Sequence, residues 1–254
     1  MSEPGFEGAI VALPPVSLDE VLDAAELQTR SDRKYIVSVG QLDMLLPRAG
    51  TAVLEIDGLR QFGYETAYFD TPDRRLYLNT AYRRPRRFNV RIRTYLDSNS
   101  SMFEVKRKDG RGRTDKDRLD LDSGRDRRRL DTEMRTFVDS SVATDVTDRL
   151  QEATITRFDR TTLVDVHHQA RYTIDHRLTS TSPDGRTVKL RNAVVVECKS
   201  AGRATPMDRA LWAVGVRPAR ISKYCTTLAL LEPSLPANHW HRTLKRHFGT
   251  AAAS

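Results

Sequence analysis

Cysteine is almost absent from this chain. Cys198 and Cys225 are its only cysteines, and neither stands in a C-x-x-C pair or at a Cys/His spacing typical of a metal site. Two isolated cysteines do not make the framework of a disulfide-rich secreted domain. We therefore expect both to be buried thiols in a protein that works in a reducing compartment.

Long apolar runs are absent as well. No stretch of 18 apolar residues occurs, so we expect no transmembrane segment. The first residues contain no basic stretch followed by an apolar one, which argues against a secretory signal. Together these absences predict a cytoplasmic protein.

Aromatic residues are few, at 7% of the chain, whereas basic residues are abundant. Lys and Arg number 42 against 34 Asp and Glu, which gives a net charge of +8. This surplus favours an anionic partner: a nucleotide, a phosphate polymer, a nucleic acid or an acidic membrane surface. Proteins that bind single-stranded nucleic acid usually combine basic residues with stacking aromatics. The shortage of aromatics therefore predicts no nucleic-acid partner.

Strand patterns dominate the predicted secondary structure. Ser17 and Glu20 form a capping box that starts a short helix, and Thr205-Pro206 and Ser222 start two others. A fourth helix is predicted near 126–150, with the run RDRRR at 125–129 on its surface. The predicted strands lie near 26–37, 64–71, 87–97, 101–108, 115–122, 154–166, 170–180 and 187–199.

The length of 254 residues predicts one domain or two. We expect an N-terminal tail at 1–16, a folded domain at 17–235 and a basic C-terminal tail at 236–254. The sequence leaves the oligomeric state open.

Alternation along several predicted strands places apolar residues on one face and charged residues on the other. In 88–96, Val90 and Ile92 share one face, while Arg91 and Arg93 share the opposite face. The charged faces of four further strands carry Glu104, Lys106 and Lys108; Lys116, Arg118 and Asp120; Arg171 and Asp175; and Glu197 and Lys199.

Two arrangements fit this pattern. One is an ordinary half-buried sheet whose charged side is solvated. The other is a sheet that closes on itself, with the charged faces lining the interior and helices covering the outside. Because Arg and Lys recur at central strand positions with single carboxylates among them, we favour the second arrangement. The expected fold is α+β, a closed antiparallel β-barrel of about eight strands with helices packed on the outside.

Seven short motifs, in order along the chain, resemble the VTC-domain family of polyphosphate polymerases in the CYTH, or triphosphate tunnel metalloenzyme, superfamily. They are ELQTRSDRKY at 26–35, YFDTPDRRLY at 68–77, VRIR at 90–93, FEVKRK at 103–108, FDRTTL at 158–163, VVVECKS at 194–200 and SKY at 222–224. The resemblance implies a tunnel domain at 17–235 that holds a triphosphate. It also implies ATP as phosphoryl donor, inorganic polyphosphate as product, and Mn²⁺ or Mg²⁺ as cofactor.

The resemblance also implies a set of site residues. The phosphate ligands are Lys34, Arg91, Arg93, Lys106, Lys116, Arg160 and Lys223. Glu197 of VVVECKS is the metal ligand and belongs to the catalytic set with Arg91, Arg93, Lys106 and Lys223. Arg30 and Arg83 are further candidates.

The expected activity is transfer of the ATP γ-phosphate to a growing polyphosphate chain. Hydrolases of the superfamily carry an E-x-E-x-K motif, whereas this chain has Glu26, Gln28 and Arg30 at the corresponding positions. That departure favours the polymerase branch over a triphosphatase. A triphosphatase and a non-catalytic module that binds polyphosphate or nucleotide remain alternatives.

Two local features stay open at this point. Glu104 is expected either to pair with a neighbouring Lys or Arg or to bind metal. Tyr68 and Asp70 are expected either to face the interior of the barrel or to form a turn at the edge of the sheet. The arginines at 74–87 are assigned to a solvated loop or a tunnel mouth.

Overall fold

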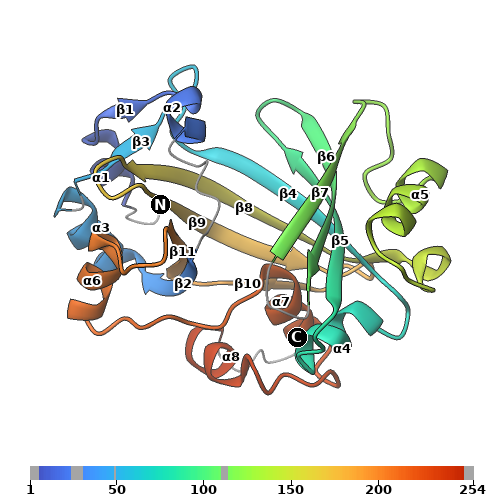
Figure 1. The fold of residues 1–254 in the computed structure, drawn as a ribbon. Coiled ribbons are helices and arrows are strands. Elements are labelled where there is room, and N and C mark those ends of the chain that lie inside the picture. The colour runs from blue at the N-terminus through green and yellow to red at the C-terminus, as the bar shows by residue number, and fades with distance from the viewer. Residues whose placement is uncertain (1–5, 24–30, 49, 110–113, 249–254) are drawn as a thin grey trace. The chain divides into compact units, whose positions relative to one another are not determined.

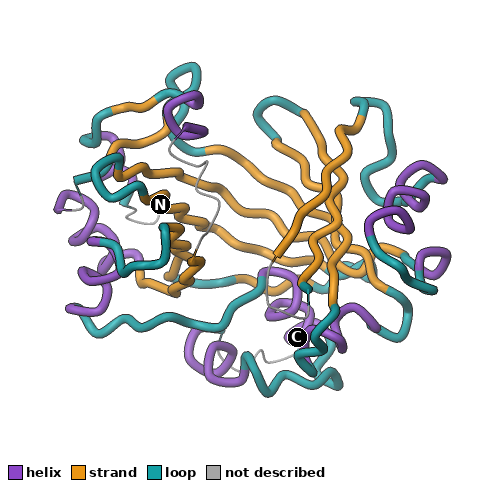
Figure 2. Tube along the Cα trace, in the orientation of Figure 1, coloured by secondary structure: helices purple, strands orange, loops and turns teal. Residues whose placement is uncertain are grey.

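The structure is a computed structural model that describes residues 6–23, 31–48, 50–109 and 114–248 (Figure 1). Strands predominate over helices in these ranges (Figure 2). Within them, no helix is both long and apolar enough to cross a membrane. The chain divides into two compact units, and the long strands β8 (Gln151–Asp165) and β9 (Ala170–Thr181) contribute to both.

The first unit comprises Met1–Phe62, Asp159–Leu178 and Leu190–Ile221. Its core contains Tyr35 and Tyr172, both fully buried. Its own strands are β1 (Pro15–Val16), β2 (Ser31–Ser38), β3 (Ala52–Leu54) and β11 (Ala193–Ser200). Its helices are α1 (Glu7–Val11), α2 (Leu18–Asp23), α3 (Val39–Leu45), the 3-10 helix η1 (Leu46–Arg48) and α6 (Pro206–Ala213).

The second unit comprises Gly63–Phe158, Thr179–Lys189 and Ser222–Ser254. Its strands are β4 (Phe62–Asp70), β5 (Arg87–Tyr95), β6 (Ser100–Lys108), β7 (Thr114–Leu121) and β10 (Thr187–Lys189). Its helices are α4 (Arg75–Ala81), α5 (Thr132–Ser141), the 3-10 helix η2 (Thr147–Arg149), α7 (Lys223–Leu231) and α8 (His241–His247).

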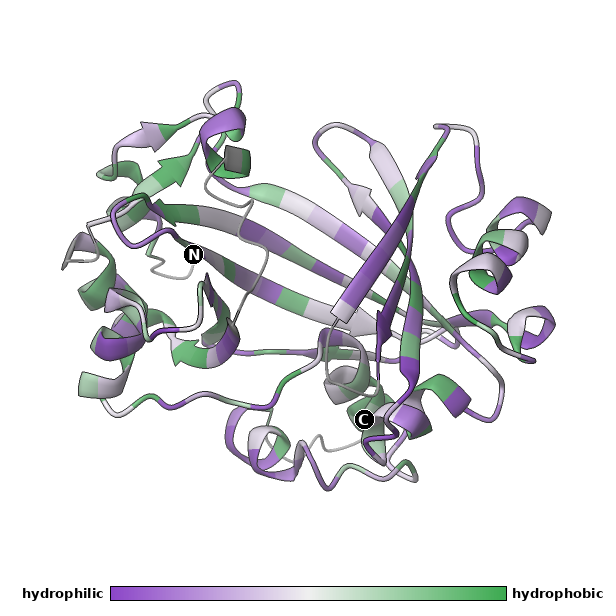
Figure 3. Cartoon of the chain, viewed as in Figure 1, coloured by the Kyte–Doolittle hydropathy of each residue, from purple (hydrophilic) through white to green (hydrophobic). Residues whose placement is uncertain are grey.

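The strands of the second unit have the two-faced character expected from the sequence. Hydrophobic and hydrophilic bands alternate along them (Figure 3). Val90, Ile92 and Phe103 are almost fully buried on one face. That face is covered by α5, where Phe137 packs on Phe103 with ring centroids 5.9 Å apart. Arg91 on β5, Glu104 on β6 and Arg118 on β7 alternate with these apolar residues and therefore lie on the opposite face.

The expectation of a closed barrel of about eight strands is wrong. The sheet has 11 strands and follows the order β2-β11-β9-β8-β4-β5-β6-β7, with β1, β3 and β10 beside this path. Among the described residues its end strands, β2 and β7, do not pair, so the sheet stays open. Alternation specifies which side chains share a face. Closure needs backbone hydrogen bonds between the two end strands, which no side-chain pattern encodes.

Two element boundaries also differ from the prediction. The strand expected at 187–199 is split into β10 and β11, and Asn192 between them has a positive φ of 51°, which interrupts the extended backbone. The helix expected at 126–150 is reduced to α5, because Asp131 caps its start by accepting from the Met134 amide. The RDRRR run therefore lies ahead of this helix and not on its surface.

Three helix starts are confirmed. Ser17 and Glu20 form the predicted capping box, and Thr205 and Ser222 cap α6 and α7. Both cysteines are buried free thiols, as expected. The predicted domain bounds at 16 and 235 stay a prediction.

Candidate functional site

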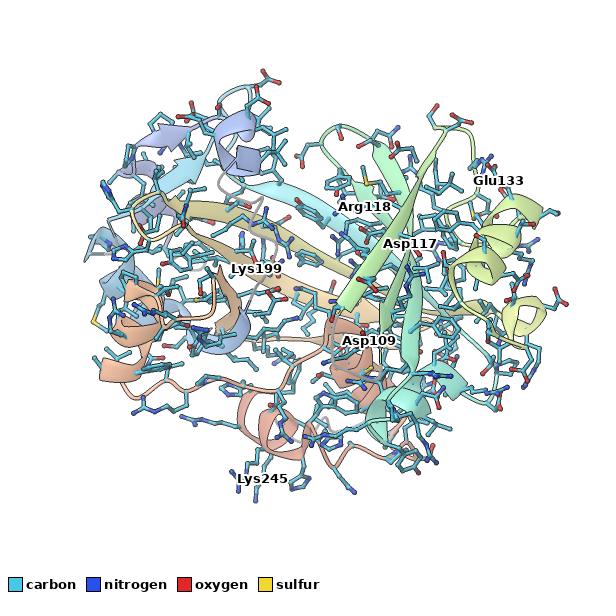
Figure 4. All side chains as sticks on the ribbon, in the orientation of Figure 1. Asp109, Asp117, Arg118, Glu133, Lys199 and Lys245 are labelled. Atoms are coloured by element: carbon cyan, nitrogen blue, oxygen red, sulfur yellow. The ribbon has the colours of Figure 1, made fainter. Side chains whose placement is uncertain are left out.

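Strand register aligns the charged residues of the second unit. Arg91 on β5 lies opposite Glu104 on β6, and Glu104 lies opposite Arg118 on β7. Residues opposite one another in an antiparallel pair point to the same face, so these three side chains converge. Figure 4 labels Arg118 and its neighbour Asp117 on β7; Asp117 leaves the strand on the other side and pairs with Arg107.

Glu104 is the centre of a cationic cluster. Its side chain is 1% exposed. Arg91 Nε donates to Glu104 Oε2 at 2.6 Å, and Arg93 lies 4.0 Å from the same oxygen. Lys116 Nζ donates to Glu104 Oε1 at 2.8 Å, and Arg118 lies 3.4 Å from it. Of the two roles left open for Glu104, the structure shows pairing with cations. We call Glu104, Arg91, Arg93, Lys116 and Arg118 the Glu104 cluster.

The Glu104 cluster holds a surplus of positive charge. Burial would raise the pKa of Glu104, but Arg91, Arg93 and Lys116 outweigh it and hold that pKa far below its usual range. Burial lowers the pKa of Lys116 to about 8, although its bond to Glu104 opposes this. Four cations around one carboxylate therefore attract a polyanion whenever Lys116 is protonated.

Lys106 belongs to the same face of the sheet. It follows Glu104 by two positions on β6, and the register places it between Asn89 on β5 and Lys116 on β7. Its side chain is half-buried. The strand alternation thus brings the predicted residues Arg91, Arg93, Lys106 and Lys116 onto one face.

Two stacked aromatic rings lie beside two of the predicted cations, Arg93 and Lys223. Tyr64 on β4 and Phe158 on β8 stack with centroids 5.2 Å apart and planes 7° apart. The Lys223 ammonium lies 4.5 Å from the Phe158 centroid, and the Arg93 guanidinium lies 5.9 Å from the Tyr64 centroid. Both distances suit cation–π attraction. The stacked pair therefore contributes to the placement of Lys223 and Arg93.

The start of α7 is held by a buried carboxylate that sequence reasoning did not assign. Asp70 is fully buried at the end of β4 and accepts from the Leu76 and Tyr77 amides at the start of α4. Its Oδ2 also accepts from the Tyr224 hydroxyl. Burial raises the pKa of Asp70, and the bonds it accepts oppose that shift. Asp70 therefore joins the YFDTPDRRLY motif to Tyr224, the residue that follows Lys223.

A second charged cluster lies within the first unit. Glu197 on β11 faces Lys34 on β2, to which the register pairs it. Lys34 Nζ lies 3.7 Å from Glu197 Oε2, and Lys199 Nζ lies 3.2 Å from Oε1. Burial lowers the pKa of Lys199, and Glu197 opposes this. Lys199, labelled in Figure 4, is a member of this cluster that the family resemblance did not single out.

Arg160 is tied to a carboxylate of the same unit. Its Nε and one terminal nitrogen donate to the two oxygens of Asp175, at 2.6 and 3.0 Å. Asp175 is fully buried and Arg160 is 15% exposed. This bidentate pair fixes the guanidinium plane, which suits phosphate recognition by an Arg edge.

The remaining predicted cations are placed differently. Arg83 is exposed in a turn and has a positive φ of 54°. Arg30, like Glu26 and Gln28, lies outside the described residues.

The arrangement of the carboxylates determines whether the described residues can hold a metal ion. In the described part of the chain, no group of three or more His, Cys, Asp or Glu side chains could hold a metal ion. The two oxygens of Glu197 face Lys34 and Lys199. Mg²⁺ in phosphoryl-transfer sites commonly takes one or two carboxylates and completes its shell with substrate phosphates and water. Glu197 therefore fits a metal that arrives with a phosphate substrate, not a preformed metal centre.

The open antiparallel sheet carries arginines and lysines around single buried or half-buried carboxylates, an arrangement with the charge to attract a polyanion. The family comparison is more specific. The VTC domain model matches residues 29–232. Because this match spans most of the chain, the protein belongs to the VTC domain family.

Solved structures of low sequence identity are also similar to this chain. A putative adenylate cyclase from Bacillus halodurans is 15% identical, with a TM-score of 0.47, over 76% of this chain and 94% of that one. The putative adenylyl cyclase HpAC1 from Hippeastrum, described as having a dominant triphosphatase activity, is 14% identical, with a TM-score of 0.46, over 82% and 98%. PH1819 from Pyrococcus horikoshii OT3 is 12% identical, with a TM-score of 0.45, over 80% and 98%. No curated protein matches the chain.

Proposed function

We propose that this chain is a metal-dependent polyphosphate polymerase that transfers the γ-phosphate of ATP to a growing polyphosphate chain in the cytoplasm. Membership of the VTC domain family supports the proposal. The observation that carries it is the Glu104 cluster, in which four cations share one buried carboxylate. Such a surplus suits a substrate with several negative charges held close together.

The cluster's role in this reaction is to bind and neutralise phosphates. Phosphoryl transfer needs little covalent work from the protein, so fixed positive charge and positioning supply most of the rate enhancement. Arg91 and Arg93 offer planar forks for phosphate oxygens, and Lys116 and Lys106 offer compact point charges. Glu104 holds Arg91, Arg93 and Lys116 in place before substrate arrives, which removes the cost of ordering them during the reaction.

The other predicted residues have complementary roles. Lys223 at the start of α7, together with Lys34 and Arg160, contributes further cations for phosphate oxygens. Glu197 supplies the carboxylate for Mn²⁺ or Mg²⁺, and a bound metal would neutralise charge on the transferred group.

One assay tests the proposed function directly. The purified chain is incubated with ATP and Mn²⁺ or Mg²⁺, with and without a short polyphosphate primer, and the products are separated by gel. Polyphosphate as the main product supports the polymerase. If orthophosphate is the only product, the chain is a triphosphatase and not a polymerase. If neither product forms but polyphosphate binds tightly, the chain is a non-catalytic binding module.

Matched variants test the part played by the Glu104 cluster. Arg91→Gln removes the cation that bonds Glu104 at 2.6 Å. Arg107→Gln is the control, because Arg107 pairs with Asp117 on the other face of the strands. We expect the first variant to lose at least about a hundredfold in turnover, within the range found when one charge-stabilising donor is removed. If both variants lose turnover equally, the Glu104 cluster has no specific part in the reaction.

A further inference from the structure

A cavity of about 610 Å³ lies within the second unit. Its wall includes Phe69, Leu130, Leu150 and Pro183, which give it an apolar part. Five arginines also line it, namely Arg74, Arg128, Arg129, Arg135 and Arg186. Three carboxylates accompany them, those of Glu152, Asp184 and Glu232. The charged lining is therefore cationic overall.

The cavity is separate from the Glu104 cluster. Tyr68 lies opposite Arg91 in the register of β4 and β5, so its side chain shares the face of that cluster. Phe69 is the next residue of β4 and points to the opposite face, where it lines the cavity. Within the second unit, the cavity therefore lies on the other face of these strands from the Glu104 cluster, and no residue of that cluster lines it.

Arg74, which lines this cavity, carries a donor that no described residue satisfies. Its Nε and one terminal nitrogen bind Glu232 in a bidentate pair, at 2.6 to 3.1 Å. Its other terminal nitrogen, Nη1, is buried and has no hydrogen-bond partner among the described residues. A buried donor without an acceptor destabilises the protein. An anion in the cavity would remove that destabilisation.

Glu152 brings an unsatisfied oxygen to the same cavity. Arg128 lies 3.6 Å from Oε1, whereas Oε2 is buried and without a partner in the described part of the chain. Burial raises the pKa of Glu152, which fits a carboxylate short of donors. Two residues that line the cavity thus each carry a buried polar atom, one donor and one acceptor, that no described residue satisfies.

An anion that both accepts and donates hydrogen bonds matches this pair. Inorganic phosphate keeps a P–OH at neutral pH even as the dianion, because it has a third ionisable proton. A terminal phosphate group, whose second pKa is about 6, has a P–OH only in its singly protonated form, which the site would select. Sulfate has oxygens of the same geometry but no hydrogen to donate. A buried acceptor that a ligand leaves unpaired discriminates strongly against that ligand.

We propose that this cavity is a second anion site that binds a protonated phosphate group, with Arg74 donating to its oxygens and Glu152 accepting from its P–OH. Arg128 and Arg129 stand at the rim, with side chains 57% and 89% exposed, and attract the anion from solvent. The site gives a function to the RDRRR run that the proposed transfer reaction does not use. The ligand is either free inorganic phosphate or the end of a polyphosphate chain.

Equilibrium dialysis of the purified chain with radiolabelled inorganic phosphate, in a large excess of sulfate, tests the site. Sulfate fills cationic surfaces that recognise charge alone, including the Glu104 cluster. The wild-type chain is expected to retain phosphate binding under these conditions. Glu152→Gln, whose amide can donate to sulfate, should reduce the preference for phosphate over sulfate by at least about tenfold, equivalent to about 1.4 kcal/mol.

Two arginines of the same run serve as test and control. Arg128→Gln alters the rim and should weaken phosphate binding, whereas Arg127→Gln should not, because Arg127 bonds to Asn99 and does not line the cavity. Arg74→Gln should abolish phosphate binding, provided that circular dichroism shows the variant to be folded. If it is not folded, the Arg128 and Glu152 variants decide the test. Unlabelled tripolyphosphate and unlabelled phosphate are then compared as competitors of the radiolabelled ion. If tripolyphosphate competes more strongly, the ligand is the end of a polyphosphate chain. If it competes more weakly, the ligand is free inorganic phosphate. Loss of all phosphate binding in sulfate, or equal effects of the Arg127 and Arg128 variants, would overturn the proposal.

Discussion

Glu104 is a single buried carboxylate that neighbours four cations, and this position gives it two opposite effects. Its negative charge offsets the repulsion between Arg91, Arg93 and Lys116, which stabilises the fold. The same charge opposes the binding of another anion beside those cations. Stability and anion affinity should therefore change in opposite directions when the carboxylate is removed.

Replacing Glu104 by Gln tests this balance. We expect the free energy of unfolding to fall by about 3–5 kcal/mol, as found when one partner of a buried ion pair is removed. Added tripolyphosphate should restore part of the loss, because it supplies the missing negative charge. Urea unfolding with and without tripolyphosphate measures both effects. Glu65→Gln, which removes the partner of the more exposed Arg157, should lose much less stability and gain less from the ligand.

Lys116 makes both stability and binding depend on pH. Its pKa is about 8 in the folded protein, below its ordinary value of 10.5, so the folded state binds fewer protons than the unfolded state between these values. Its destabilising contribution is therefore fully present below pH 8 and declines as the pH rises from about 8 to 10.5. Anion binding changes in the opposite direction, because the deprotonated amine no longer attracts phosphate.

We expect the affinity for tripolyphosphate, measured by titration calorimetry without metal, to fall as the pH rises through about 8. Lys116→Arg should flatten this dependence, since Arg stays charged over the whole range. Lys189→Arg, at an exposed position of β10, should leave the dependence unchanged. The same pH profile in the wild type and in Lys116→Arg would show that another group is responsible.

At the scale of elements, α7 shows how a buried hydrogen bond connects distant segments. Asp70 at the end of β4 accepts from the start of α4 and from the Tyr224 hydroxyl in the first turn of α7. Lys223 is the first residue of that helix, and its ammonium lies over the Phe158 ring. The bond from Tyr224 therefore stabilises the segment that carries Lys223.

Tyr224→Phe should lower the free energy of unfolding by about 1–3 kcal/mol, because it leaves a buried carboxylate oxygen with one donor fewer. Urea unfolding monitored by circular dichroism gives this value. Tyr82→Phe, at a side chain that is 60% exposed, is the matched control and should have little effect. If the two variants are equally stable, the Asp70–Tyr224 bond contributes nothing measurable.

The sequence predicted the strands well because their signal is local. Alternation along 88–96 is enough to place Arg91 and Arg93 on the same face, and the capping residues Ser17 and Thr205 mark their helices. The position of Glu104 among four cations could not be predicted from such a local pattern. That role depends on the register of three strands, which is set by backbone pairing between separate segments.

The role of Asp70 was missed for a similar reason. Asp70 meets Tyr224 across 154 positions of sequence, so no local pattern joins them. Lys199 shares the face of Glu197, but the motif comparison singled out only the carboxylate.

At the scale of the whole molecule, the wrong expectation of a closed barrel also arose because pairing between distant segments has no local sequence signal. Two-faced strands occur both in barrels and in open sheets, and only the pairing of β2 and β7 distinguishes them.

At the scale of the whole molecule, the proposed activity consists of two separable events, anion binding and metal-dependent transfer. Glu197 lies between Lys34 and Lys199 and is the carboxylate to which we assign the metal. Replacing it by Gln leaves the two ammonium groups with one less counter-charge. Metal-free binding of ATP or tripolyphosphate should then be unchanged or tighter, because the carboxylate repels phosphate.

We expect Glu197→Gln to lose at least about a hundredfold in turnover with Mn²⁺ while it keeps its metal-free affinity for tripolyphosphate. Turnover is read from polyphosphate formation, and affinity from titration calorimetry in the presence of a chelator. Asp159→Asn is the control within the same unit, since Asp159 pairs with the exposed Arg177 and should affect neither quantity. Glu197→Asp should restore part of the turnover, because it keeps a carboxylate oxygen for the metal. Full turnover in Glu197→Gln would remove this residue from the metal site, whereas loss of metal-free binding together with turnover would make it a structural residue of the first unit.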